Sequence, residues 1–332
     1  MPRRLALALL IAVAVAAGTA TTTGAGEGPT AAAAAPPAAA QAPPLLPHTR
    51  SYYMGNASPD AATRLGCANA DTQGRLTLFF GAPIVTQGAF GATLWGGADR
   101  TAAQAADLVR DFVRGYAWCR RSPTQQVLVG MGTSNSTIDR RNDLWVYGHG
   151  VAWATAVRDA AAWAEAHYPG VARIYGAWDA EPSWSAPQKA EQWLRGYDSV
   201  PGRRALHANF SADGCPRDTA HNGGCNNGWN QETLWRLAWR YEPSLPIPQI
   251  YATSGVNAAQ WQKIDEYGAR AHGDGMTFFG AMAQHGACAQ VGGCRLIDNP
   301  PQVARDQLLF VLNSHPLTQQ PTLENATDMH WH

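Results

Sequence analysis

The sequence predicts an α/β protein built on a parallel β-sheet, and the leading architecture is a (β/α)8 TIM-like barrel. Short apolar runs bounded by Gly or Pro alternate with longer segments of helical periodicity, which is typical of parallel sheets with crossover helices. The chain has 332 residues, of which 45% are hydrophobic, so it can bury a full core. A doubly wound parallel sheet is the alternative, although no G-x-G-x-x-G or G-x-x-x-x-G-K-[ST] motif supplies the usual nucleotide anchor.

Seven segments are predicted to be strands of this sheet. Six of them are short apolar runs whose ends carry Gly, Pro or polar residues. They are residues 75–83, 125–132, 171–179, 204–210, 248–253 and 276–283. Residues 51–55 are a weaker candidate for a first strand, and an eighth strand is not evident.

Helices are predicted between these strands. Apolar side chains recur at spacings of three and four in several segments, which gives each helix one face for the core. Asn230 and Asn257 are suited to cap two further helices. The predicted helical segments include residues 101–119, 151–167, 187–197 and 303–312.

The N-terminal segment is predicted to direct export. Arg3 and Arg4 precede an uninterrupted apolar run over residues 5–17, which is the pattern of a signal peptide covering residues 1–20. An uncleaved N-terminal anchor is the alternative. Residues 21–48 are rich in Ala, Pro, Thr and Gly and are expected to form a disordered tether. The mature protein is therefore expected to be secreted or extracellular, either free or associated with the cell surface.

The rest of the chain is expected to form one domain. Residues 49–316 are assigned to the barrel and residues 317–332 to a C-terminal tail. After the signal segment no apolar run approaches the roughly 18–20 residues of a spanning helix, so no integral membrane span is expected. The 25 basic and 25 acidic side chains balance, which argues against nucleic acid as a partner. A monomer is expected.

All six cysteines lie in the predicted domain, and an even number in an exported protein suggests disulfides. Two pairs are close in sequence within Gly-rich loops, which leaves the two remaining cysteines for each other, although six cysteines allow fifteen pairings. The favoured pairs are Cys67–Cys119, Cys215–Cys225 and Cys288–Cys294. A metal site is disfavoured because neither local pair has C-x-x-C spacing.

Two carboxylates at the end of a predicted strand are the candidate catalytic residues. Asp179 and Glu181 are two positions apart, so on an extended backbone they point to the same side, with Cα atoms roughly 7 Å apart. Ligands of parallel α/β folds bind at the carboxyl ends of the strands. Two close carboxylates in a partly apolar site separate each other's pKa values, so that one can act as an acid, which glycosidic cleavage requires. The alternative is a helix-capping Asp followed by a solvent-exposed Glu.

An Asp-x-Glu pair that closes a central strand of an exported barrel resembles the TIM-barrel glycoside hydrolases, including the lysozyme-like family 25 and the chitinase-like family 18. The resemblance covers residues 179–181 and the general strand and helix order. It implies that Glu181 is the general acid and that Asp179 is its electrostatic partner. Residues 174–178 lack the aspartates that precede the chitinase glutamate, and residues 51–56 lack the first-strand Asp of the lysozyme-like family. The second carboxylate or nucleophile is therefore unassigned.

Aromatic and polar side chains near predicted strand ends are the candidate substrate-binding residues. Aromatic planes can pack against the apolar faces of sugar rings, and amide or hydroxyl groups can orient sugar substituents. The candidates are Trp95, Trp178, Trp184, Trp229, Asn209, Tyr251 and Gln284. Asp213 also follows a predicted strand, at the start of a long loop that is expected to form one wall of the cleft.

These patterns favour a secreted glycoside hydrolase that cleaves a polysaccharide or peptidoglycan with two carboxylates and without a cofactor. No catalytic metal is expected because the sequence has no H-E-x-x-H motif, and a Ser nucleophile is disfavoured because it has no G-x-S-x-G motif. The alternative function is a non-catalytic barrel that binds a glycan or the cell surface. The missing first-strand acid favours this alternative, whereas two carboxylates on one face favour the enzyme.

Overall fold

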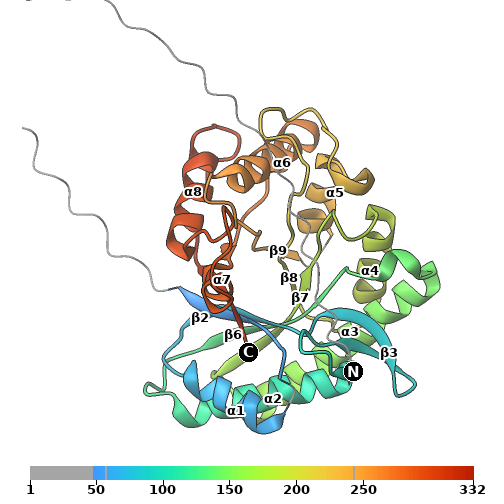
Figure 1. Cartoon of the computed structure of the whole chain (residues 1–332), viewed down its shortest axis with the longest axis vertical. Helices are drawn as coiled ribbons and strands as arrows, with labels where there is room; N and C mark the ends of the chain where they lie inside the picture. Colours follow the sequence, from blue (N-terminus) through green and yellow to red (C-terminus); the bar gives the residue numbers. More distant parts are fainter. Residues whose placement is uncertain (1–47, 57, 242–243) are drawn as a thin grey trace, which may run out of the picture. The chain divides into compact units, whose positions relative to one another are not determined.

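Eight parallel strands form the sheet that positions the site (Figure 1). They are β1 (Thr49–Tyr53), β2 (Gly74–Phe79), β6 (Val127–Ser134), β7 (Ala172–Asp179), β8 (Leu206–Ala208), β9 (Ser244–Pro246), β10 (Ala281–Ala283) and β11 (Ala326–Trp331). Their order in the sheet is β10-β11-β1-β2-β6-β7-β8-β9, so the last strand of the chain pairs with the first. The predicted α/β class with a parallel sheet is confirmed.

The structure is a computed structural model that describes residues 48–56, 58–241 and 244–332. The predicted signal peptide over residues 1–20 lies outside the described residues, as does the predicted tether over residues 21–48 apart from His48. Within the described part of the chain, no helix combines the length and the apolar character needed to span a bilayer.

Strands β9 and β10 are the two edges of the paired sheet. The segments next to them approach each other through an isolated parallel bridge between Gln249 and Met282. Two backbone hydrogen bonds of 2.8 Å accompany this bridge, from Met282 N to Pro248 O and from Ile250 N to Met282 O. No strand ladder joins β9 to β10 among the described residues, so the sheet is a half-barrel and not the closed barrel that the sequence predicts.

The eighth strand, β11, lies in the segment predicted to be a C-terminal tail, residues 317–332. The tail prediction is wrong for this strand, because β11 pairs with β1 on one side and with β10 on the other. Its polar side chains find partners inside the sheet: the hydroxyl groups of Ser51 and Thr327 hydrogen-bond to each other at 2.7 Å. A buried strand with the sequence ATDMHW is not an apolar run, which is why the hydrophobic pattern does not reveal it.

One strand is displaced from its predicted position. The sequence predicts residues 248–253, whereas β9 ends at Pro246 and the residues after it form only the bridge at Gln249. Pro246 and Pro248 have no backbone N–H and cannot donate to a ladder, which interrupts regular pairing here. The other predicted strands overlap the observed ones with shifted ends.

Helices connect most of the strands, as the sequence predicts (Figure 1). Asn230 caps α5 by accepting a 2.8 Å hydrogen bond from Thr233 N. Asn257 does not cap α6, which follows Gly255; its side chain accepts a 2.8 Å bond from Ala252 N instead. The helices are α1 (Pro59–Ala68), α2 (Ala102–Cys119), α3 (Asp143–His167), α4 (Pro187–Asp198), α5 (Gln231–Trp235), α6 (Val256–His272), α7 (His285–Gln290) and α8 (Pro301–Asn313), with short turns at Ile138–Arg140, Asn226–Gly228 and Arg236–Arg240.

A small antiparallel sheet, which the sequence does not predict, is inserted between β2 and α2. It consists of β3 (Ala82–Thr86), β4 (Ala89–Thr93) and β5 (Asp99–Thr101). Buried His149 of α3 anchors it: His149 Nε2 lies 2.9 Å from Gly91 O, and His149 Nδ1 accepts a 2.9 Å bond from Trp193 Nε1. Because Nδ1 accepts, the ring is neutral with its proton on Nε2, and burial lowers the pKa of His149 to about 4. The inserted sheet carries Trp95 in the turn between β4 and β5.

The three predicted disulfides are confirmed. They are Cys67–Cys119, Cys215–Cys225 and Cys288–Cys294. The first joins α1 to α2, and the other two close loops that follow β8 and β10. Disulfides form and persist in oxidising compartments, so this pattern is consistent with an extracellular protein.

Candidate active site

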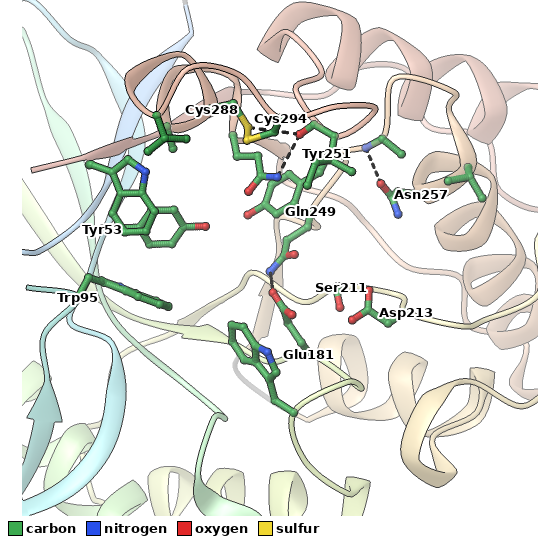
Figure 2. Close-up of a pocket in the computed structure, with 18 residues that line it drawn as sticks. Tyr53, Trp95, Glu181, Ser211, Asp213, Gln249, Tyr251, Asn257, Cys288 and Cys294 are labelled. Carbon is green, nitrogen blue, oxygen red and sulfur yellow. Dashed lines mark hydrogen bonds between the residues drawn. A yellow bond between two sulfur atoms is a disulfide. The ribbon is translucent and has the colours of Figure 1, made fainter. Parts of the chain in front are cut away.

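A pocket of about 550 Å³ lies at the carboxyl ends of the parallel strands. Tyr53 and Trp331 are the last residues of β1 and β11, while Glu181, Tyr251 and Gln284 follow β7, β9 and β10. Figure 2 shows side chains from these separate segments around one common space. This end of the strands is where folds of this class bind their ligands.

Gln249 joins the two predicted catalytic carboxylates. Its Nε2 donates to Asp179 Oδ1 at 2.6 Å and to Glu181 Oε1 at 3.3 Å, and it also contacts Asn209 O at 3.2 Å. Because both carboxylate oxygens contact one nitrogen, they lie within about 6 Å of each other. Asp179 is buried beneath the pocket, whereas Glu181 is partly exposed and lines it.

The two carboxyl groups hold protons more tightly than isolated carboxyl groups do. Burial raises the pKa of Asp179 to about 8, the negative charge of Asp213 adds to the rise, and the Gln249 hydrogen bond opposes it. Burial also raises the pKa of Glu181, and the charges of Asp179 and Asp213 raise it further. The pair therefore retains a proton at neutral pH. Glu181 is the member that can deliver it into the pocket.

Two tyrosines contribute neutral hydroxyl groups to the same space. The side chains of Tyr53 and Tyr251 are hydrogen-bonded to each other. Burial raises the pKa of both phenols, and the nearby charge of Asp179 raises both pKa values further. Their mutual hydrogen bond lowers the pKa of Tyr53 and raises that of Tyr251. Both hydroxyl groups stay protonated at neutral pH, so the end of the first strand offers a phenol where the lysozyme-like family has an Asp.

Tyr53, Trp95 and Trp331 form an aromatic cluster on one side of the pocket. The ring centroid of Tyr53 is 5.0 Å from that of Trp95 and 4.6 Å from that of Trp331, and the two indoles are 5.9 Å apart. Trp95 and Trp331 are 38% and 39% exposed, so a ligand can reach them. Trp184 lines the pocket from the loop after β7. The structure thus places the predicted Trp95 and Trp184 at the pocket, and their binding of a sugar stays a prediction.

Trp178 is not available to a ligand, which corrects its assignment as a substrate-binding residue. Successive strand residues point to opposite faces, so Trp178 points away from the face that Asp179 occupies. Its side chain is 0% exposed and stacks on Trp193 of α4 with ring centroids 4.4 Å apart. It is a core residue between the sheet and a helix.

Trp229 and Asn209 are also predicted substrate-binding residues that the structure buries outside the pocket lining. Trp229 donates from Nε1 to Ser185 O at 2.6 Å. Asn209 donates from Nδ2 to Ile247 O at 3.0 Å. Trp229 is 1% exposed and Asn209 is 0% exposed, and neither side chain lines the pocket, so the prediction of direct substrate contact is wrong for both.

The wall next to α7 is largely apolar. The Cys288–Cys294 disulfide, Val291 and Ile297 line the pocket there. The predicted Gln284 also lines the pocket, and its Nε2 donates to Ile297 O at 3.0 Å. Gln284 therefore supports this wall, and its contact with a substrate stays a prediction.

Gln249, Ser211 and Trp331 are pocket residues that the sequence analysis does not identify. Ser211 directly follows a predicted strand, and this position is the only feature of the sequence that points to the pocket. Gln249 is not identified because the predicted strand over residues 248–253 places it within a strand ladder. Trp331 is not identified because it lies in the segment predicted to be a C-terminal tail.

Within the described residues, no group of three or more His, Cys, Asp or Glu side chains is arranged to hold a metal ion. The absence of a cofactor stays a prediction. In comparisons with known proteins, no family model matches this chain and no curated protein matches it. The geometry of the pocket is therefore what a functional proposal has to explain.

Proposed function

We propose that this protein is a glycoside hydrolase in which Glu181 protonates the glycosidic oxygen of the leaving group. The observation that supports it is the placement of Asp179 and Glu181, joined through Gln249, at the edge of an aromatic-lined pocket. The raised pKa values of both carboxyl groups agree with a proton held there. A carboxyl group whose pKa lies above neutral is protonated at working pH and can act as a general acid. A pocket of about 550 Å³ is within the usual range for small-molecule sites.

Asp179 acts through Glu181 in this proposal. It is 3% exposed and does not line the pocket, so it does not reach the substrate. Its carboxyl group shares the retained proton with Glu181, and Gln249 holds the two groups at a fixed separation. As the glycosidic bond breaks, positive charge develops on the sugar, and the negative charge of the site stabilises it.

A polysaccharide or peptidoglycan is the proposed substrate class. Sugar rings would pack against Trp95, Trp331 and Trp184, whose indoles are accessible around the carboxylates. The pairing of the last strand with the first supports a TIM-like scaffold for this reaction. The disulfides and the signal-like N-terminal segment support secretion, where such polymers occur.

Reducing-sugar release from a panel of polysaccharides and purified peptidoglycan tests the proposal. The variants are Glu181→Gln and, as a matched control, Glu165→Gln, which changes an exposed residue at a separate pocket near the start of β7. We expect the wild type and the control to release sugar at the same rate. We expect Glu181→Gln to be slower by about 10²- to 10⁴-fold, the usual contribution of a general acid.

Equal release by the wild type and Glu181→Gln would show that the reaction takes place elsewhere. No release by any form, together with retention of a glycan in pull-down, would replace the hydrolase with a non-catalytic glycan-binding barrel.

A further inference from the structure

We propose that Asp213 is the second carboxylate of the reaction, the one that faces the anomeric carbon while Glu181 protonates the leaving group. This inference rests on the proposed hydrolase function and assigns the role that the sequence leaves open. Asp213 lines the same pocket as Glu181, from the loop after β8, the strand next to β7. Its charge acts on both Glu181 and Asp179, so it lies within electrostatic range of the acid pair.

Hydrogen bonds fix Asp213 relative to the loop that carries Glu181. Ser183, two residues after Glu181, donates from Oγ to Asp213 Oδ2 at 2.7 Å. Asn226 donates from Nδ2 to Ser183 Oγ at 3.0 Å and from its backbone N to Asp213 O at 3.0 Å. The Cys215–Cys225 disulfide closes the loop between these contacts. A carboxylate held in this way needs no reorganisation before it meets a substrate.

Ser211 provides an independent sign of a ligand beside Asp213. Its side chain lines the pocket and is 5% exposed, and its Oγ has no hydrogen-bond partner among the described residues. Figure 2 shows Ser211 and Asp213 next to each other and beside Glu181. A buried hydroxyl without a partner costs free energy, so this group is suited to bind a sugar hydroxyl at the position where Asp213 faces the ring.

The bond changes are those of a glycosidic displacement. Glu181 gives its proton to the glycosidic oxygen, the bond from C1 to that oxygen breaks, and the electron pair leaves with the alcohol. C1 then receives an electron pair from an Asp213 oxygen, which gives an ester that water later hydrolyses, or from a water molecule whose proton Asp213 accepts. The first course retains the configuration at C1 and the second inverts it. Asp213 is the charged partner in both.

Leaving-group dependence separates this role from that of Glu181. Aryl glycosides of a sugar accepted by the wild type are prepared with 2,4-dinitrophenol, which needs no proton to leave, and with phenol, which does. Glu181→Gln should lose about 10²- to 10⁴-fold on the phenyl glycoside and much less on the dinitrophenyl glycoside. Asp213→Asn should lose about 10²-fold or more on both. Asp218→Asn, an exposed change in the same loop, is the control and should match the wild type.

Azide keeps the test independent of folding defects. With Asp213→Ala, azide can enter the space of the lost carboxylate, attack C1 and displace 2,4-dinitrophenolate, so the product should be a glycosyl azide. The stereochemistry of the wild-type hydrolysis product distinguishes a nucleophilic Asp213 from one that acts as a base. Ser183→Ala, which keeps the carboxylate, should lose about tenfold on both substrates, as expected for one hydrogen bond to a charged group.

Three outcomes would overturn the assignment. Wild-type rates for Asp213→Asn would exclude Asp213 while leaving Glu181 in place. Losses by Asp213→Asn that depend on the leaving group would make Asp213 the acid. A wild type inactive on every glycoside would remove the hydrolase proposal itself, and this inference with it.

Discussion

The side-chain nitrogen of Gln249 lies 2.6 Å from a carboxylate oxygen of Asp179, and the two residues are 4% and 3% exposed. The bond links the segment after β9 to the end of β7, across β8. An amide N–H that donates to a carboxylate favours the charged form. This bond therefore limits how far burial can raise the pKa of the acid pair, and it makes Gln249 a positioning residue.

Replacing Gln249 with Leu should move the alkaline limb of the kcat/KM profile to higher pH. The lost hydrogen bond no longer lowers the pKa of Asp179 and Glu181, so the general acid stays protonated further into the alkaline range. We also expect kcat to fall by about tenfold or more, because the carboxylates lose their fixed separation. A pH series of kcat/KM on one substrate measures both effects. An alkaline limb that stays in place would contradict this role.

Replacing Asp179 with Asn should stabilise the protein at alkaline pH while it lowers activity. The pKa of Asp179 is raised to about 8 from an ordinary value of 3.8, so the folded state keeps a proton that the unfolded chain releases. This contribution to wild-type stability is complete below about pH 4 and is lost as the pH rises through 8. The variant does not titrate at this position, so its free energy of unfolding relative to the wild type should rise by about 4–5 kcal/mol between pH 4 and pH 8. Urea unfolding at pH 4 and pH 8 measures this difference in free energy of unfolding. The same difference at both pH values would show that the pKa of Asp179 is not raised in the folded state.

His149 should make the fold sensitive to acid in the opposite direction. Its pKa is lowered to about 4 from 6.5, so the unfolded chain binds a proton that the folded state excludes, and stability falls as the pH drops from 6.5 towards 4. Over this pH range the wild type should lose about 3 kcal/mol of unfolding free energy. His149→Phe should cost about 2–4 kcal/mol at pH 7, because Gly91 O and Trp193 Nε1 lose their partner. The difference in free energy of unfolding between the wild type and His149→Phe should be smaller at pH 4 than at pH 7 in urea titrations. A difference of constant size would rule out a neutral His149 ring.

Trp331 should contribute to substrate binding more than to the chemical step. Trp331→Ala removes an indole that is 39% exposed in the aromatic cluster, and we expect KM to rise about 5- to 50-fold with a smaller change in kcat. Trp118→Ala, at an indole that is 71% exposed on α2, is the matched control and should leave both constants unchanged. A fall in kcat at constant KM would instead give Trp331 a role in the transition state.

Trp178 should behave as a core residue. Trp178→Ala removes a fully buried indole from its stack on Trp193, and the expected loss is about 3–5 kcal/mol of unfolding free energy. Thermal unfolding measures this loss, and substrate KM should change little at temperatures where the variant is folded. An unaltered melting temperature with a raised KM would restore Trp178 to the binding surface.

Apolar runs and helical spacing were sufficient for most of the fold. They predict the α/β class and six of the eight strands of the parallel sheet, because a strand buried on both faces must be apolar along its length. They miss β11 because hydroxyl and carboxyl groups inside the sheet are satisfied by neighbours that only the tertiary structure supplies, as for Ser51 and Thr327. The inserted antiparallel sheet is missed for a different reason. Its hairpin from β3 to β4 turns at Gln87 and Gly88, which both have positive φ, but the predicted strand over residues 75–83 runs past the end of β2 into β3.

The sequence predicts the parts of the candidate site in which local spacing determines the direction of the side chains. The two-residue spacing of Asp179 and Glu181 places both at one strand end, and the structure joins them through one amide. The same alternation, applied to Trp178, would have placed it on the opposite face. Asp213 and Gln249 could not be assigned roles from sequence, because those roles depend on distances between loops that follow different strands.

The pairing of β1 with β11 makes the pocket depend on the two ends of the folded domain at once. Tyr53 and Trp331 stand in register across that pair, so their contact cannot form from local folding of either half of the chain. A contact between such distant segments depends on the sheet that joins them, so we expect it to be lost together with that sheet. Loss of the proposed hydrolysis in rising denaturant should therefore coincide with global unfolding, so that an assay of this activity would report the unfolding of the whole sheet.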